Sequence, residues 1–174
     1  MESYYHGTSS GIDPLICYMN LPMLIKSKSS IGTVDLPKQK KGQGAIFLID
    51  TGRPGRTQPL VQWFLNKLKQ KEFKKMFDEH FIPYNDEWIR EFLKGETKEL
   101  FYNLYYVSKF LLEHLHPMIP KLFRKVWENG LETKAFYLKL CGSGGGGFLL
   151  GFTEDLELAQ KHLEDHQIKV IHKF

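Results

Sequence analysis

The chain has 174 residues, of which 42% are hydrophobic, so it is long enough to bury one sizeable core, and its length favours a single domain. Its 24 basic residues are mixed with 20 acidic ones, so the formal charge of +4 provides no long field of one sign and nucleic acid is not an expected partner. The two cysteines, Cys17 and Cys141, are too few for a disulfide framework and have no metal-ligand spacing.

The amino-terminal segment and the hydropathy pattern predict a soluble, cytoplasmic protein. The chain does not open with a basic segment followed by an apolar stretch, and no apolar run approaches the roughly 18 residues that cross a bilayer. We therefore expect no membrane partner. The densest basic run, Lys38 to Lys41, lies between Pro37 and Gly42 and is expected to be a solvated loop.

In chain order, the first third predicts a loop, a short helix and two strands. The polar segment 2–13 leads into an apolar helix or turn over 14–18 and a strand near 23–25. Residues 44–50 are rich in β-forming side chains and end at Thr51-Gly52, which is typical of a buried strand followed by a turn. Thr57 then suits the N-cap of a helix with apolar residues at positions 60, 61, 64 and 68.

The middle of the chain is expected to be helical, and the last third returns to strands. Helices are predicted from about residue 85 to Gly95, from about 97 to His116-Pro117, and from about 120 to 128 with an end at Asn129-Gly130. Strands follow at 135–140, 148–152 and 168–171, with a helix over 154–163. Strands around a helical middle indicate an α+β fold.

A run of small residues, 142–147, separates two of these predicted strands. Backbone N–H groups without neighbouring side chains can form a concave nest that suits phosphate oxygens. The run has no P-loop spacing, and a tight structural hairpin or a flexible linker are the alternatives.

Two segments resemble the GHMP family of small-molecule kinases. Residues 139–147 resemble its third conserved motif, with Cys141 in place of the usual Thr and Ser143 in place of Ala. Residues 6–13 resemble the HGxxSGxD segment of the mevalonate-kinase-like members, and the two segments occur in the family's order.

The resemblance implies roles for individual residues. Asp13 would be the catalytic carboxylate, and Thr57 would lie near the catalytic centre. Glu2, eleven positions before Asp13, would bind Mg²⁺. The substrate-binding segment would contain His6, Gly7, Ser10 and Gly11, and the nucleotide phosphates would lie against Gly142, Ser143, Gly144, Gly145, Gly146 and Gly147. Two further residues have two interpretations each. His6 is either an acid or base or a hydrogen-bonded loop residue, and Lys139 is either a phosphate ligand or a lysine that points to solvent.

The implied protein is the carboxy-terminal half of an ATP- and Mg²⁺-dependent kinase for a small-molecule hydroxyl, with mevalonate favoured. Its antiparallel sheet would pack against a helical segment, with residues 1–58 carrying the catalytic Asp, 59–133 the helices and 134–174 the glycine loop. The family's PxxxGLGSSA loop does not occur in the sequence. We therefore expect that the ATP-binding half is missing, that the chain alone is inactive, and that exposed sheet edges favour a homodimer. A sugar kinase, a diphosphomevalonate decarboxylase and a non-catalytic binding module remain alternatives.

Overall fold

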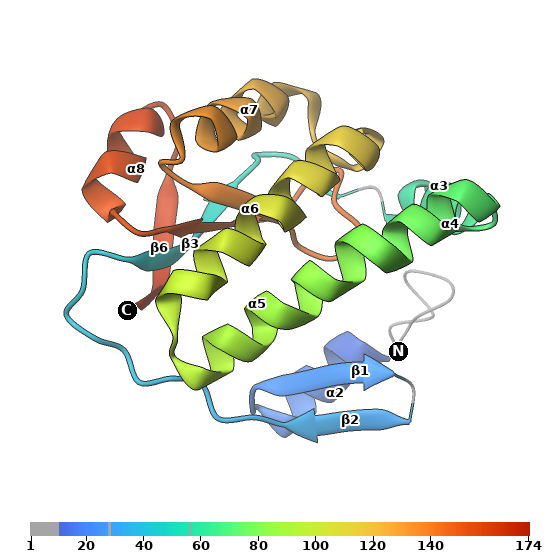
Figure 1. The fold of residues 1–174 in the computed structure, drawn as a ribbon, viewed down its shortest axis with the longest axis horizontal. Coiled ribbons are helices and arrows are strands. Elements are labelled where there is room, and N and C mark those ends of the chain that lie inside the picture. Colours follow the sequence, from blue (N-terminus) through green and yellow to red (C-terminus); the bar gives the residue numbers. More distant parts are fainter. Residues whose placement is uncertain (1–10, 28, 56) are drawn as a thin grey trace. The chain divides into compact units, whose positions relative to one another are not determined.

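The computed structural model describes residues 11–27, 29–55 and 57–174, and the chain forms two compact units, residues 1–37 and 38–174. In the first unit, helix α2 (Ile12–Met19) ends at Asn20, which adopts a left-handed φ of 49° and donates its N–H to the Ile16 carbonyl (2.9 Å). Strands β1 (Met23–Ser27) and β2 (Ser30–Thr33) follow as an antiparallel ribbon (Figure 1). The sequence did not predict β2, because its four exposed residues have no hydrophobic alternation.

The second unit contains a four-stranded antiparallel sheet in the order β4-β5-β3-β6. Its strands are β3 (Ala45–Asp50), β4 (Tyr137–Leu140), β5 (Phe148–Thr153) and β6 (Ile168–Lys173). The strand at 44–50 was predicted and becomes β3, which pairs with β5 on one side and β6 on the other. The expected α+β fold with an antiparallel sheet is therefore confirmed.

Helices fill the chain between β3 and β4 and connect the last two strands. They are α3 (Thr57–Leu68), α4 (Lys71–Met76), the π-helix η1 (Phe77–Phe81), α5 (Ile82–Lys94), α6 (Thr97–His114), the short 3₁₀ turns η2 (His116–Met118) and η3 (Lys121–Phe123), α7 (Arg124–Thr133) and α8 (Leu156–His162). Helices α5 and α6 lie side by side and reverse at Gly95, whose φ of 75° suits a residue without a Cβ (Figure 1).

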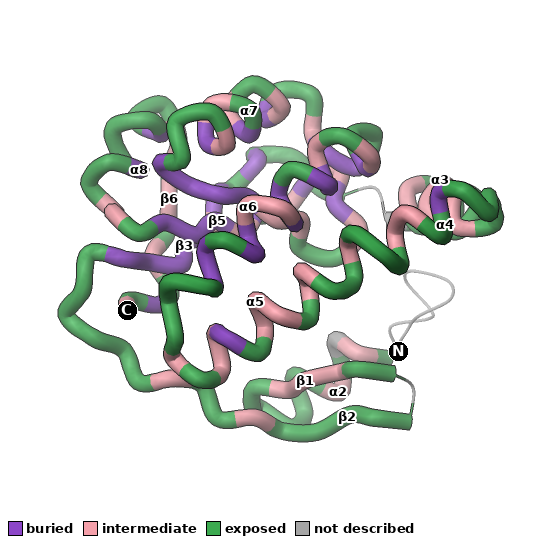
Figure 2. Tube along the Cα trace, in the orientation of Figure 1, coloured by how far each residue is buried: buried purple, intermediate pink, exposed green. Residues whose placement is uncertain are grey.

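The core of this unit contains two clusters on the sheet. Ile46 joins the first half of α6, whereas Phe47 and Ile49 join a cluster that includes Trp127 of α7 and Ala159 of α8. This separation follows from the alternation of side chains along a strand. Figure 2 shows the result: β3 and β5 are largely buried, β4 is partly buried, and β6 and the outer faces of the helices are largely exposed or half-buried.

Two predicted helix boundaries were wrong. The helix expected to end at Asn129-Gly130 continues to Thr133, because Gly130 is buried against Phe136 instead of ending the helix. A Cβ at Gly130 would lie 2.5 Å from the Phe136 ring, so glycine is needed there for close packing. The helix expected from residue 85 begins at Ile82, and α4 and η1 before it were not predicted.

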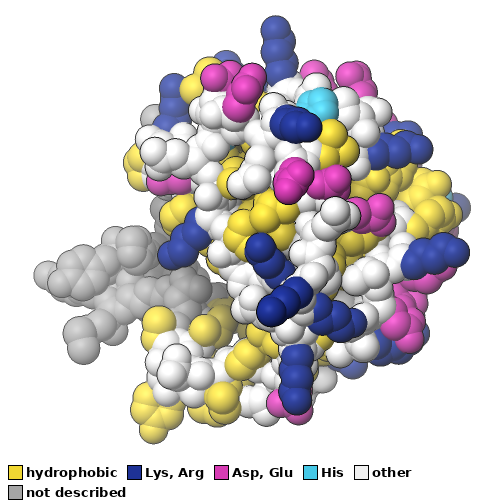
Figure 3. Space-filling model, turned by 90° about the vertical axis from the view of Figure 1, so that its left-hand side faces the viewer, with side chains coloured by type: hydrophobic (Ala, Val, Ile, Leu, Met, Phe, Trp, Pro, Cys, Tyr) yellow, Lys and Arg dark blue, Asp and Glu magenta, His cyan; other side chains and the backbone are white. Residues whose placement is uncertain are grey.

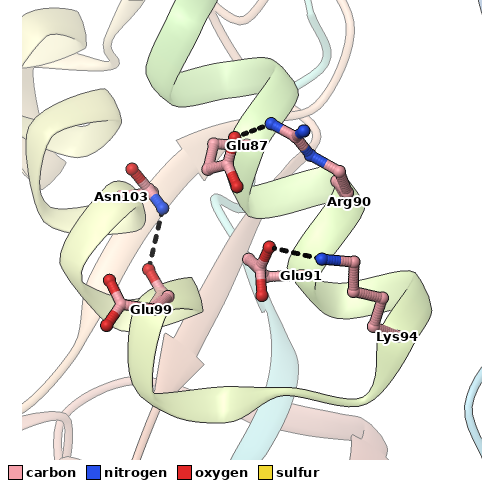
Figure 4. Close-up of polar contacts among 6 residues, drawn as sticks. All are labelled: Glu87, Arg90, Glu91, Lys94, Glu99 and Asn103. Atoms are coloured by element: carbon pink, nitrogen blue, oxygen red, sulfur yellow. Dashed lines mark hydrogen bonds and ion pairs between the residues drawn. The ribbon is translucent and has the colours of Figure 1, made fainter.

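Polar contacts within α5 and within α6 lie near the corner that joins the two helices (Figure 4). Glu91 is only 4% exposed, and the Lys94 ammonium lies 3.2 Å from its carboxylate. A hydrogen bond with Glu96, and then Lys94, lowers the pKa of Glu91 although burial acts in the opposite direction. Arg90 pairs with Glu87 on the outer side of the same helix (Figure 4).

The surface charges are mixed. On the face seen in Figure 3, basic, acidic and hydrophobic side chains are interspersed, as the balanced composition suggests. In the described part of the chain, no helix combines the length and the apolar character that a membrane crossing requires.

Candidate functional site

The glycine run forms a loop between β4 and β5 that is fixed to two other segments. The Gly145 N–H donates to the Met118 carbonyl (2.7 Å), and the Gly147 N–H donates to the Arg53 carbonyl (2.6 Å). Thr51, which is buried at the end of β3, donates both its N–H (2.9 Å) and its hydroxyl (2.7 Å) to the Gly147 carbonyl. A loop held by these bonds is not a flexible linker.

Close packing explains two of the glycines. A Cβ at Gly144, whose φ is 70°, would lie 2.4 Å from the Met118 carbonyl oxygen. A Cβ at Gly146 would lie 2.5 Å from the Pro54 carbonyl oxygen. Gly142 shares the left-handed backbone of Gly144, with a φ of 60°. It differs from both glycines in its surroundings, because a Cβ there would meet nothing within 4 Å.

The loop also presents backbone donors that its own fold does not use. Within the described residues, the N–H groups of Gly142, Ser143 and Gly146 have no acceptor. The N–H groups of Gly145 and Gly147 donate to the carbonyls of Met118 and Arg53, so only part of the run can bind a phosphate. The hydrogen bonds of the loop show a tight structural hairpin, and the phosphate nest stays a prediction.

Two pockets border the loop. One, which we call the basic pocket, has a volume of about 660 Å³ and is lined by Gly145, by the turn after β3 and by the segment that connects α6 to α7. Its charged lining residues are Arg53, Lys121 and Arg124. The other, which we call the apolar pocket, has a volume of about 350 Å³ and is lined by Gly142, Ser143, Lys139 and a set of hydrophobic side chains. The hydrogen bond from Gly145 to Met118 lies where the linings of the two pockets meet.

Lys139 does not extend freely into solvent, so that alternative was wrong. Its side chain is half-buried in the apolar pocket, and its ammonium lies 5.3 Å from the centre of the Trp88 ring. Burial lowers the pKa of Lys139. No carboxylate pairs with it in the part of the chain that the structure describes.

Only some of the residues predicted for the site can be located. Glu2, His6, Gly7 and Ser10 lie outside the described residues. Gly11 precedes α2 with a left-handed φ of 73°.

The backbones of Asp13 and Thr57 lie in the first turns of α2 and α3, but their side chains are not described. Among the described residues no group of His, Cys, Asp and Glu could hold a metal ion. The roles of Asp13, Glu2 and Thr57 therefore stay predictions.

Sequence reasoning missed the residues that surround the glycine loop. Thr51 and Arg53 were predicted only as part of the turn that follows the strand at 44–50. Lys121 and Arg124 were predicted only as part of the helix from about residue 120, and none of the four was predicted to line a pocket.

Comparison with known proteins gives a fold match without a sequence match. Neither a protein-family model nor a curated protein matches the chain. The structure of L. major mevalonate kinase in complex with R-mevalonate matches it with a TM-score of 0.73 over 97% of this chain and 54% of that one, at 17% identity. The chain has the fold of part of a GHMP kinase.

Two further structures agree with this match. Streptococcus pneumoniae phosphomevalonate kinase, in complex with phosphomevalonate and AMPPNP, matches 82% of this chain and 43% of its own, with a TM-score of 0.60 and 16% identity. A Listeria innocua protein matches the same shares at a TM-score of 0.57 and 20% identity. The chain thus spans about half the length of the solved structures that it matches, and identities this low show the fold alone.

Proposed function

We propose that the chain forms part of an ATP-dependent kinase of the mevalonate-kinase type, which transfers a phosphoryl group to a small-molecule hydroxyl. The observation that carries the proposal is the glycine loop: it is fixed by hydrogen bonds, and yet within the described residues it leaves the N–H groups of Gly142 and Ser143, which are not buried, without an acceptor. Backbone donors of this kind suit phosphate oxygens.

The residues of this chain would contribute binding and alignment. Phosphoryl transfer depends mainly on positioning and on charge stabilisation. The free N–H groups of Gly142 and Ser143 would hold nucleotide phosphate. Asp13 would orient or deprotonate the attacking hydroxyl, and Thr57 would belong to the catalytic centre. The substrate would be contacted by His6, Gly7, Ser10 and Gly11. Glu2 would bind Mg²⁺, which neutralises phosphate charge when it is present.

The proposal also names a substrate and a surface for a homodimer. Mevalonate is favoured by the segment 6–13 and is consistent with the ligand of the L. major enzyme. A sugar kinase, a diphosphomevalonate decarboxylase and a binding module that has lost catalysis are the alternatives. Strands β4 and β6 form the edges of the described sheet. The Leu138 N–H of β4 donates to the buried Ser108 hydroxyl of α6, so β6 is the candidate surface for a homodimer.

A coupled assay of ADP release tests the proposal. It compares the protein of this sequence with the product of the whole reading frame, using mevalonate, phosphomevalonate and galactose as substrates. We expect mevalonate-dependent turnover from the longer protein only. Asp13→Asn should abolish it, and Asp165→Asn, which makes the same change at an exposed position, should leave it intact.

Turnover with galactose alone would move the assignment to a sugar kinase. Turnover that survives Asp13→Asn would remove the catalytic role of Asp13. Inactivity on every substrate, together with retained AMPPNP binding, would favour the binding module.

A further inference from the structure

The basic pocket has features of a binding site that the glycine motif does not explain. We propose that it binds the phosphate group of a small organic phosphate with a compact apolar carbon skeleton, as an anion site separate from the donors of the glycine loop. The inference does not depend on whether the chain belongs to an active kinase.

The charge of the pocket is the first argument. Three cationic side chains, Arg53, Lys121 and Arg124, line it, and among the described lining residues there is no Asp or Glu. None of the three pairs with a carboxylate in the described part of the chain. Three uncompensated positive charges around one cavity favour a ligand group with more than one negative charge, such as a phosphate monoester, over a carboxylate.

Arg124 is held in place before any ligand arrives. Its Nε donates to the Ile119 carbonyl (3.3 Å) and its Nη2 to the His116 carbonyl (3.0 Å). A guanidinium has five N–H donors, so these two bonds orient the group and leave three donors for a ligand. The rigid, planar fork of arginine matches two phosphate oxygens at once.

The rest of the lining indicates what the phosphate is attached to. It is mostly apolar and includes Pro54, Leu60 and Phe123. Among the described lining residues Thr51 is the only one with a neutral polar side chain, and its hydroxyl already donates to the Gly147 carbonyl. Sugar hydroxyls would find few partners there, and unpaired polar groups are costly to bury. The volume of about 660 Å³ lies within the usual range for small-molecule sites.

The pocket is distinct from the donor nest of the loop. Gly145 is the only loop glycine in its lining, and the N–H of that residue is already donated to Met118. Gly142 and Ser143, which carry free N–H groups, line the apolar pocket instead. An anion in the basic pocket would therefore be held by side chains.

Isothermal titration calorimetry on the chain itself, at low ionic strength, tests the proposal with butyl phosphate, butyrate and glucose 6-phosphate. The test variant is the double substitution Arg53→Gln and Lys121→Gln, because both side chains are exposed and neither makes a side-chain bond that the fold needs. The control is Lys125→Gln with Lys169→Gln, which removes the same charge from two exposed positions outside the pocket.

We expect butyl phosphate to bind more tightly than the other two ligands, and its Kd to rise at least tenfold in the test variant, since each lost charged contact weakens binding several-fold. The control should change its Kd less than twofold. The proposal is overturned if the chain does not bind butyl phosphate, if both variants bind it equally, or if butyrate or glucose 6-phosphate binds as tightly.

Discussion

The contact between Gly144 and Met118 predicts that two neighbouring glycines tolerate alanine very differently. In Gly142→Ala, the new Cβ meets nothing, so the main cost is the left-handed backbone, about 1–2 kcal/mol. The stiffer unfolded chain offsets about 0.4–1 kcal/mol of that. The expected loss of unfolding free energy is therefore about 1 kcal/mol.

Gly144→Ala has the same cost for a left-handed backbone, and it adds a steric clash that costs further unfolding free energy. Its Cβ would lie 2.4 Å from the Met118 carbonyl oxygen, so the loop must shift. The shift should break the bond from Gly145 to Met118, worth about 1 kcal/mol, and displace the backbone at a cost of about 1–3 kcal/mol. Gly144→Ala should therefore lose about 2–4 kcal/mol more than Gly142→Ala.

Urea denaturation followed by circular dichroism measures the difference from the two midpoints, provided that the slope m stays constant. Because whole domains are stable by only about 5–15 kcal/mol, a gap of this size is easy to detect. If the two variants lose the same stability within about 0.5 kcal/mol, the loop is not packed on Met118 as described.

Three further predictions concern buried polar groups. Thr51→Val removes the hydroxyl that donates to Gly147 and should cost about 1 kcal/mol in urea denaturation, while Thr51→Ser should cost less if the bond is the cause. Ser108→Ala should cost about 1–3 kcal/mol, because the Ser108 hydroxyl accepts the N–H of Leu138 in a buried position; a loss below about 0.5 kcal/mol would show that this N–H finds another partner. Burial lowers the pKa of His172, so the unfolded chain binds more protons than the folded one below about pH 6.5, and stability should fall as pH is lowered from 7.5 to 5.5. His172→Phe should reduce this fall in melting temperature, and an unchanged pH profile would contradict the assignment.

The elements that the sequence predicted well are those in which local signals and tertiary packing agree. Strand β3 combines β-branched residues with a terminal turn. Helix α3 begins within one residue of the prediction, because Thr57, the predicted N-cap, is its first helical residue. Helix α7 was predicted too short because glycine in a sequence suggests an end, whereas Gly130 is required by the ring of Phe136 beside it. That ring contact lies outside any local pattern.

The candidate site was predicted in part for the same reason. The glycine loop has a local signature, so the run 142–147 was found and its position between two strands was confirmed. Arg53 and Arg124 lie far apart in the sequence and reach one pocket only through the fold. No spacing rule connects them, so only the three-dimensional structure could bring them together.

The topology of the four-stranded sheet has a consequence for how the protein is made. β3 is a central strand, yet both of its partners come about a hundred positions later, with Asp50 facing Phe148. Ribosomes add about 5–20 residues per second, so β3 waits roughly 5–20 s after synthesis before either neighbour exists. Such non-local pairing is intrinsically slow, and an apolar strand with two open edges is prone to aggregation meanwhile. A nascent chain arrested before residue 148 should therefore be more sensitive to protease and more dependent on chaperones than a chain synthesised through residue 174.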